Sequence, residues 1–204
     1  MIKLYKNFIF DMGNVLMDFS PDYITSRFTS NVEDIELLKK IIFSGDEWSR
    51  LDQGVITFDE VCTATKAKLP NRLHATCDKL FEEWHLHKLP NHEMTQLVKD
   101  LKARNYGIYL CSNAAARFYS YMDNYEVFKY FDDLTISADL KISKPNPEIY
   151  NHILDKHQLD PKTCLFIDDI NANIVGANNV GIAGYHFNGN TKLFRAFLET
   201  IKVL

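Results

Sequence analysis

A short apolar run, Phe8–Phe10, ends in Asp11 and is followed at once by Gly13 and Asn14. The run is typical of a buried strand, and glycine and asparagine favour a tight turn directly after it. In an open α/β sheet, an acid at the carboxyl end of a strand points into the crevice where ligands bind. A solvated aspartate in an ordinary turn fits this stretch equally well, so residues far along the chain must decide.

The rest of the chain predicts alternating strands and helices, interrupted by one long helical block. We expect strands at residues 4–11, 106–111, 134–137, 163–167 and 181–187. Helices are expected around 94–101, over 114–128, from Pro147, over 171–179 and from about Thr191. The last helix is expected to bury Leu193, Phe197, Leu198 and Ile201. Alternating strand–helix units of this length predict a parallel sheet with right-handed crossovers.

The helical block covers residues 21–89, where helix periodicity dominates and no strand-like run occurs. Asn31 suits the N-cap of one helix, and Thr57 with Glu60 forms a capping box for another. A further helix is expected over 71–85.

Two units follow from this pattern. We expect an α/β core domain made of residues 1–16 and 90–204, and an inserted α-helical cap domain made of residues 17–89. The cap would leave the core directly after the first strand and return to it before the alternation resumes.

Polar side chains occupy the places where the predicted parallel strands end. They are Asp11, then Ser112 with Asn113, then Lys144 after the third strand, then Asp168 with Asp169. These strand ends share one edge of the sheet, so the side chains can converge. Three carboxylates packed together repel one another, and a divalent cation can hold them ionised. Oxygen ligands of this kind suit Mg²⁺.

The remaining groups at these strand ends suit a phosphate ester. Lys144 and the donors of Ser112 and Asn113 can hold phosphate oxygens, and Asp11 can act as a nucleophile while Mg²⁺ neutralises charge. The pattern therefore matches phosphoryl transfer. Ser112 and Asn113 could also cap the following helix. Both roles are compatible, because a helix N-terminus attracts phosphate.

In motif order and spacing, the chain resembles the haloacid dehalogenase superfamily over roughly residues 7–16 and 93–187. Its four motifs are similar to Asp11–Val15, Leu110–Asn113, Lys144–Pro145 and Phe166–Asn173. The resemblance implies a Rossmann-like parallel sheet core with a small inserted helical cap. It also implies a reaction through an aspartyl-phosphate intermediate.

The resemblance implies a particular set of metal ligands as well. Mg²⁺ would be bound by the Asp11 carboxylate, the backbone carbonyl of Gly13 and Asp169. Asp168 would either share the metal or orient Lys144 and the metal-bound waters from one contact further out.

One position departs from the family pattern. Many family phosphatases carry a second aspartate two residues after the nucleophile, as general acid and base, and this chain has Gly13 there. The implied metal ligand, a backbone carbonyl, is kept, whereas the proton donor is lost. A positioned acid–base contributes about 10²–10⁴ in rate. Asp18 could replace it, or could be an ordinary turn residue before Ser20 and Pro21.

Two further choices concern the third and fourth motifs. Lys141 competes with Lys144 for the lysine role, and Pro145 together with the family spacing favours Lys144. Asn173 is either a surface helix residue or, as the resemblance implies, a residue close to the site.

Several residues of the predicted cap domain could have either a functional or a purely structural role. His85 and His87 form an HxH pair, but no third ligand is near in sequence, so we expect no metal there. Trp48 is expected in the cap core rather than on a substrate platform. Arg50 could face the cleft.

Composition excludes several other classes. The net charge of −4 and the pI near 6.0 come with no basic stripe, so no nucleic acid partner is expected. No signal-like segment or bilayer-length apolar run occurs, so we expect a cytoplasmic protein without a membrane partner. Cys111 and Cys164 lie in predicted strands and no CxxC pair occurs, which favours free thiols.

The expected function is that of a Mg²⁺-dependent phosphatase acting on a small phosphorylated metabolite. A sugar phosphate is the expected class, because the motif Asp11–Val15 resembles that of a subgroup of bacterial sugar-phosphate phosphatases. One alternative is a non-catalytic regulatory protein that binds metal and phosphate, an idea motivated by Gly13. Another is a haloacid dehalogenase, which the pair Asp168 and Asp169 disfavours, because those enzymes do not need the metal.

Overall fold

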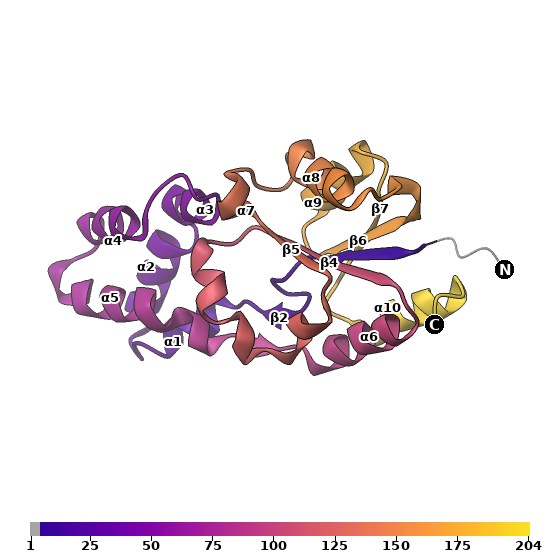
Figure 1. The fold of residues 1–204 in the computed structure, drawn as a ribbon. Helices are drawn as coiled ribbons and strands as arrows, with labels where there is room; N and C mark the ends of the chain where they lie inside the picture. The colour runs from indigo at the N-terminus through magenta and orange to yellow at the C-terminus, as the bar shows by residue number, and fades with distance from the viewer. Residues whose placement is uncertain (1–4) are drawn as a thin grey trace.

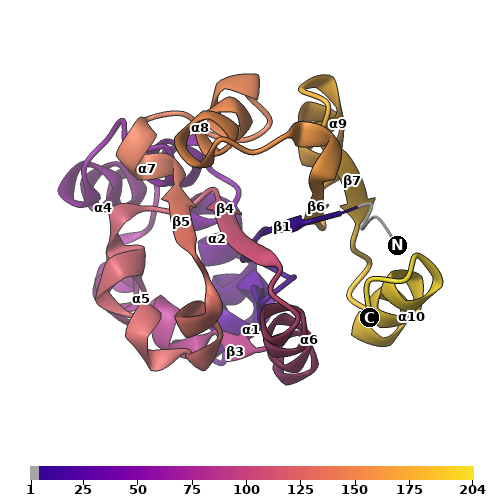
Figure 2. The same cartoon turned by 45° about the vertical axis from the view of Figure 1, so that its right-hand side comes forward.

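The computed structural model describes residues 5–204 and contains a five-stranded sheet in which all neighbouring strands are parallel (Figure 2). The strands are β1 (Asn7–Phe10), β4 (Gly107–Ser112), β5 (Asp133–Ile136), β6 (Cys164–Asp168) and β7 (Ala183–His186). Their order across the sheet is β5-β4-β1-β6-β7. The predicted parallel sheet is present. Residue 4, the expected start of the first strand, lies outside the described residues, and β1 begins at Asn7.

Helices cover both faces of this sheet (Figure 1). One face carries α6 (His92–Ala103) and α10 (Thr191–Thr200), and the other carries α8 (Pro147–His157) and α9 (Asn171–Asn179). Two short elements complete this part of the chain, α7 (Ser137–Leu140) after β5 and η6 (Pro161–Thr163) before β6. A central parallel strand is therefore covered on both sides, which explains the unbroken apolar sequence of β1.

The three apolar residues of β1 divide between two cores. Phe8, Ile9 and Phe10 are all 0% exposed. Phe8 and Phe10 pack into the cluster with α6 and α10, whereas Ile9 packs into the cluster with α8 and α9, because successive strand side chains point to opposite faces. This packing fixes the depth and direction of Asp11, which follows directly.

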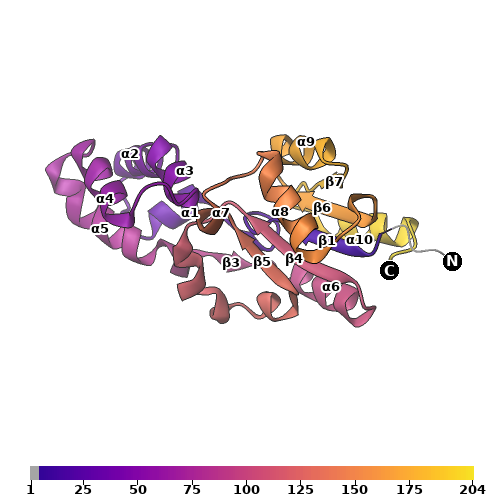
Figure 3. The same cartoon turned by 45° about the horizontal axis from the view of Figure 1, so that its top comes forward.

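A second group of helices lies at one end of the molecule (Figures 1 and 3). Its elements are α1 (Pro21–Ser26), α2 (Val32–Ile42), α3 (Asp46–Asp52), α4 (Phe58–Ala67), η1 (Asn71–Leu73), α5 (His74–Glu83) and η2 (Trp84–His87). They enclose a hydrophobic cluster of their own, which includes Leu38, Leu80 and Phe81. We refer to this group as the cap.

Local sequence signals explain where the cap helices begin. The Asn31 side chain accepts from the backbone N–H of Asp34 at the start of α2. Thr57 and Glu60 form the predicted capping box of α4. The helix expected over 71–85 is divided into η1, α5 and η2.

Two short strands join the cap to the sheet. β2 (Met17–Asp18) leads out and β3 (Leu89–Pro90) leads back, and they pair with each other in antiparallel fashion. One expected domain boundary, between residues 16 and 17, directly precedes β2, and the other, between residues 89 and 90, falls within β3. The division into residues 1–16 with 90–204 and residues 17–89 stays a prediction.

The segment expected to be a helix over 114–128 is different in the structure. It forms three short 3₁₀ turns, η3 (Ala116–Ser120), η4 (Met122–Asn124) and η5 (Glu126–Tyr130). Tyr125 adopts an extended backbone between two of them. The ring of Phe118 packs edge-on against Tyr121 and Phe128, so tertiary packing of aromatic side chains overrides the helical pattern in this segment.

One residue of the final helix also differs from expectation. Asn190 caps α10, and its buried face includes Phe194 and Leu198. Leu193, expected in the core, is 52% exposed because it lies beside this face. Phe197 and Ile201 pack partly against the core as expected.

Two expectations from composition can be compared with residues 5–204. All four cysteines are free thiols, and Cys77, Cys111 and Cys164 are buried. None of the described helices combines the length and the apolar character that crossing a membrane requires.

Candidate active site

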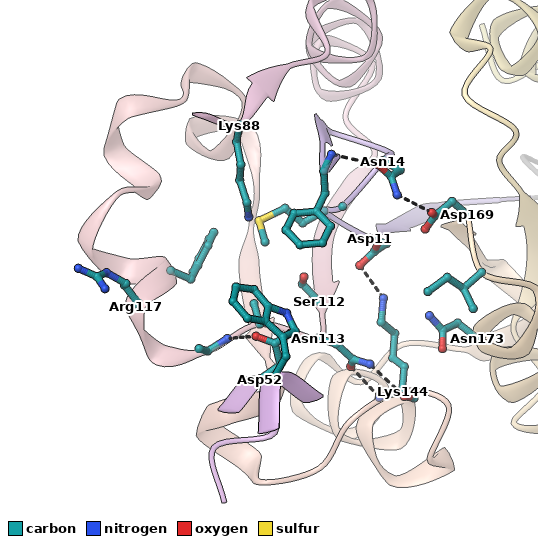
Figure 4. Close-up of a pocket in the computed structure, with 18 of the residues that line it drawn as sticks. Asp11, Asn14, Asp52, Lys88, Ser112, Asn113, Arg117, Lys144, Asp169 and Asn173 are labelled. Atoms are coloured by element: carbon teal, nitrogen blue, oxygen red, sulfur yellow. Dashed lines mark hydrogen bonds and ion pairs between the residues drawn. The ribbon is translucent and has the colours of Figure 1, made fainter. Parts of the chain in front are cut away.

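The carboxyl ends of β1, β4 and β6 open into one cavity of about 220 Å³ between the sheet and the cap (Figure 4). Asp11, Ser112, Asn113, Lys144 and Asp169 line this cavity. These residues come from four separate parts of the chain. The structure therefore brings the predicted strand-end residues together, as expected for a parallel sheet.

Lys144 lies between two carboxylates at the base of this group. Its Nζ donates to Asp11 Oδ1 at 2.6 Å and to Asp168 Oδ2 at 2.7 Å. The lysine is 5% exposed and Asp168 is 0% exposed. Burial alone would lower the pKa of Lys144, but the charges of Asp11 and Asp168 outweigh it and raise that pKa. The ammonium therefore stays charged at neutral pH.

Asp11 combines burial with close charges of both signs. Desolvation raises its pKa, the charge of Lys144 opposes this, and the charge of Asp168 adds to it, with a resulting pKa of about 6. The carboxylate is therefore mostly ionised at pH 7 and available for chemistry. Its remaining oxygen, Oδ2, lies on the side of Gly13.

Asp168 and Asp169 are adjacent in sequence but differ in surroundings. Asp168 accepts hydrogen bonds from Lys144, from the Asn173 side-chain amide at 3.0 Å and from the backbone N–H of Ile170 at 2.8 Å. Asp169 is only partly buried and accepts one hydrogen bond, from the Asn14 side chain at 2.9 Å. Asp168 is thus saturated by protein donors, whereas Asp169 is open toward the cavity.

The three carboxylates form a group that could hold a cation. One oxygen each of Asp11, Asp168 and Asp169 lie within 4.8 Å of one another. Lys144 supplies a single positive charge to this group, so a negative excess remains. The ligand atoms are all oxygen, and Asp11 and Asp169 line the cavity, which fits a hard divalent cation such as Mg²⁺.

The two predicted phosphate ligands at the end of β4 differ in their contacts. Ser112 is 2% exposed and lines the cavity. The Asn113 side chain accepts from the Lys144 backbone N–H at 2.8 Å and donates to the Lys144 carbonyl at 3.0 Å. This pair of bonds holds the loop that carries Lys144. The phosphate roles of Ser112 and Asn113 stay predictions.

Other residues named from the sequence lie in different places. Asp18 is exposed on β2 and does not line the cavity. Lys141 and Arg50 are exposed as well. His85 stacks on Tyr121, and neither it nor His87 belongs to the acidic group above, which alone meets metal-site geometry among residues 5–204.

Four lining residues had little or no signal in the sequence. In the sequence, Asn14 is a turn former within the motif Asp11–Val15 and has no role of its own. In the structure it adopts a left-handed backbone with φ of 52° and donates to Asp169. Asp52 enters from the cap and Lys88 from the segment that leads back to the sheet (Figure 4). Tyr121, from the 3₁₀ turns, lines the same cavity. Trp48 belongs to the cap core, as expected, and also lines the cavity. Only the position of Asn14 beside a strand-end motif could have suggested its role.

Comparison with known proteins agrees with this geometry. The family model of haloacid dehalogenase-like hydrolases matches residues 5–181. The chain belongs to this family. A sesquiterpene phosphatase of Aspergillus oryzae is 27% identical over 190 residues, which are 91% of this chain and 91% of that enzyme. A phosphoglycolate phosphatase of Vibrio vulnificus is 27% identical over 58% of this chain and 54% of its own length.

A solved structure supports the fold. A haloacid dehalogenase family enzyme of Bacteroides thetaiotaomicron, in complex with magnesium and inorganic phosphate, has a TM-score of 0.66 at 24% identity. The match covers 91% of this chain and 96% of that one. The expected Rossmann-like α/β fold is therefore confirmed. The protein is a haloacid dehalogenase-like hydrolase with phosphatases among its relatives.

Proposed function

We propose that this hydrolase is a Mg²⁺-dependent phosphatase that acts on a small phosphorylated metabolite, with a sugar phosphate as the substrate class. The observation that carries the proposal is the position of Asp11, beside Lys144 and two further carboxylates at the base of the cavity between sheet and cap. Phosphatases among the relatives support the same reaction type.

The residues that would hold Mg²⁺ are Asp11, Asp169 and the backbone carbonyl of Gly13. Asp168 accepts hydrogen bonds from three protein donors. Asp168 is therefore better suited to positioning Lys144 than to binding Mg²⁺ directly. Bound Mg²⁺ would neutralise the charge of the carboxylates and of the phosphate, so that an anion can attack an anion.

The remaining steps belong to side chains of the core. Asp11 attacks phosphorus in line, and the bond between phosphorus and the alcohol oxygen breaks. Lys144 and Ser112 steady the phosphate oxygens during transfer. Water then attacks the aspartyl phosphate, which releases phosphate and restores the Asp11 carboxylate. Gly13 offers no acid, so the leaving oxygen takes its proton from another group or from water.

The cap contributes by closing the cavity. The backbone N–H of Ala115 in the core donates to Asp52 of the cap at 3.1 Å. Arg117 in the core donates to the Phe81 carbonyl of the cap at 2.7 Å. Such contacts exclude bulk water during attack, which favours transfer of the phosphoryl group from the substrate to Asp11 over side reactions.

The test measures phosphate release from a panel of sugar phosphates and p-nitrophenyl phosphate, with Mg²⁺ and with EDTA. Asp11→Asn should lower kcat by about 10⁴-fold or more, because it removes the nucleophile. Asp18→Asn is the matched control, since Asp18 is exposed outside the cavity, and its rates should equal those of the wild type.

Release that requires both Mg²⁺ and Asp11 supports the proposal. A folded protein that binds Mg²⁺ but releases no phosphate from any compound would favour the regulatory alternative. Turnover by Asp11→Asn protein, free of contaminating phosphatases, would contradict the covalent mechanism.

A further inference from the structure

Lys88 is a buried cation whose partners are incomplete. It lies between η2 and β3, where the chain returns from the cap, and it is 6% exposed. Its Nζ donates to the Tyr121 hydroxyl at 3.0 Å. An ammonium group has three N–H donors. Asp52 and Asp11 act on this one through their charge, and its hydrogen bond within the described residues goes to the Tyr121 hydroxyl. Donor capacity is therefore left over inside the cavity.

Aromatic rings surround this ammonium. Nζ lies 4.7 Å from the ring centre of Trp84, 5.1 Å from that of Tyr121 and 5.8 Å from that of Phe19. Ring faces favour a cation at such distances. They cannot accept the remaining hydrogen bonds in the way a carbonyl or hydroxyl oxygen can. This arrangement fixes the side chain while it leaves donors free.

Asp52 is the acidic counterpart on the same wall. It ends α3 and lines the same cavity as Lys88, and both face Asp11 across the cavity (Figure 4). One carboxylate oxygen accepts from the backbone N–H of Ala115. Trp48 supplies a second hydrogen bond to the carboxylate. A carboxylate offers about four lone-pair positions, so acceptor capacity also remains.

The electrostatics of this pair agree with an unfilled polar subsite. Desolvation raises the pKa of Asp52 to about 7, against the opposing charge of Lys88. Desolvation lowers the pKa of Lys88 to about 8, against the charges of Asp52 and, to a lesser degree, Asp11. Each group is buried with less compensation than Lys144 has from Asp11 and Asp168.

We propose that Lys88 and Asp52 form the subsite for the leaving group, and that this group is neutral and carries several hydroxyls, as in a sugar or a sugar alcohol. Lys88 would donate to hydroxyl oxygens and Asp52 would accept hydroxyl protons. The rings of Trp48 and Trp84 would cover the C–H surface between the hydroxyls. This inference rests on the proposed phosphatase function, which supplies the phosphate end of the same cavity.

Two other leaving-group chemistries fit this wall less well. A second anionic group would meet the carboxylate of Asp52 as well as the ammonium of Lys88, so the attraction would be largely cancelled. A purely apolar group would leave both side chains without their hydrogen bonds, which costs about 1–3 kcal/mol for each buried polar group. Hydroxyl groups satisfy the donor and the acceptor together.

The experiment compares phosphate esters that share the reacting group and differ in the leaving group. The probes are hexose 1- and 6-phosphates and ribitol 5-phosphate, with ethyl phosphate, phosphoglycolate and farnesyl phosphate for comparison. Each is assayed with wild type, Lys88→Met, Asp52→Asn and the control Lys192→Met, whose lysine side chain is 85% exposed. Titration calorimetry of the same probes with Asp11→Asn protein and Mg²⁺ measures binding without turnover.

We expect the wild type to prefer one or more polyhydroxylated esters. The ratio of kcat/KM for these esters to kcat/KM for ethyl phosphate should fall at least tenfold in Lys88→Met and Asp52→Asn, mainly through KM. Lys192→Met should keep the wild-type ratio. In the Asp11→Asn background, Lys88→Met should weaken binding of the sugar phosphate by a similar factor and leave binding of inorganic phosphate within about twofold.

Three outcomes would overturn this inference. They are equal losses on all substrates, a wild-type preference for phosphoglycolate, and a wild-type preference for farnesyl phosphate. If no ester is hydrolysed by any form, the phosphatase proposal fails. Calorimetry still decides the subsite in that case, because sugar phosphate binding that is insensitive to Lys88→Met would contradict it.

Discussion

The two ends of the cavity hold charged side chains in opposite ways. At the core end, Lys144 contacts Asp11 and Asp168 directly, and every charge of this trio has a charged partner within 2.7 Å. At the cap end, Lys88 lies among aromatic rings with one hydroxyl partner, and Asp52 is held by neutral donors. The core trio is held together by direct ion pairs, whereas the cap end has spare hydrogen-bonding capacity.

The difference has a physical origin in the fold. Core-end residues follow buried parallel strands, whose packing places them at one edge with little freedom. Cap-end residues sit on a helix end and a connecting segment, which meet the core only through a few contacts. A preorganised core end suits a phosphate group that is common to all substrates, and an uncompensated cap end suits selection among leaving groups.

The largest expected contrast concerns the two buried lysines. Lys144→Met should lower the free energy of unfolding by about 3–5 kcal/mol, because it leaves two buried carboxylates without their cation. Lys88→Met should raise the free energy of unfolding by about 1–3 kcal/mol. The reason is that folding lowers the pKa of Lys88 from 10.5 to about 8 and thus disfavours its charged form. Urea unfolding at pH 7 in EDTA measures both.

The pH dependence of this contrast follows from the same pKa. The cost of burying charged Lys88 is complete below pH 8 and is relieved as the pH rises toward 10.5. The advantage of Lys88→Met over the wild type should therefore shrink across that range. If Lys88→Met lowered the free energy of unfolding at pH 7, the buried charge of Lys88 would stabilise the fold as that of Lys144 does, and the expected contrast would be wrong.

A smaller contrast is expected within the pair Asp168 and Asp169. Asp168→Ala should lower the free energy of unfolding by about 3 kcal/mol, since three buried donors lose their acceptor. Asp169→Ala should change it by less than about 1 kcal/mol in metal-free buffer, because Asp169 is partly exposed and accepts one bond. Equal effects in urea unfolding would contradict the different environments of the two aspartates.

Magnesium affinity offers a test of the core end that depends on pH. Binding requires ionised Asp11, whose pKa is raised to about 6 in the metal-free protein. The apparent dissociation constant for Mg²⁺ should therefore be constant above pH 7 and rise by about tenfold for each unit below pH 6. Titration calorimetry between pH 5 and 8 measures this.

The matched control for that titration is Asp11→Asn, which cannot titrate at this position. Its weaker Mg²⁺ binding should depend much less on pH over the same range. A wild-type dissociation constant that does not change between pH 5 and 7 would show that Asp11 stays ionised throughout and that the raised pKa is wrong.

The smallest expected effect is a gain at Gly13. A Cβ added there would lie 3.8 Å from Asp11 Oδ2 and 4.0 Å from the Phe19 Cβ, which are ordinary contacts. Gly13→Asp should raise kcat on alkyl phosphates by about tenfold, below the full value of a positioned acid, because the rest of the site is not adapted to it. The gain on p-nitrophenyl phosphate should be smaller, since nitrophenolate leaves without protonation. Gly13→Ala is the control, and equal gains on both substrates would refute an acid–base role.

Much of the core end was predictable from sequence. Asp11, Ser112 and Asp168 each follow a strand-like run, and Lys144 precedes a helix that begins with Pro147. Strand ends in a parallel sheet meet by geometry, so local patterns were enough to place them together. Asn173 was an open case, and its contact with Asp168 became visible only when α9 was placed beside β6.

The cap end was not predictable in the same way. Lys88 stands between His87 and Leu89 in a segment without periodicity, where a solvated lysine is the ordinary expectation. Asp52 ends a short helix just before Gly54, where an acid is common in turns. The segment 114–128 forms 3₁₀ turns rather than a helix because aromatic packing outweighs local propensity.

The sequence by itself determined the parallel sheet and the convergence of Asp11, Lys144 and Asp168, because local hydrophobic patterns and strand–helix alternation predict burial and strand direction. Only the tertiary structure decided which side chains of the cap face that group. Docking of the cap depends on contacts between distant segments, such as Ala115 with Asp52 and Lys88 with Tyr121. No periodicity within either segment encodes such contacts, and they form the wall that we propose selects the substrate.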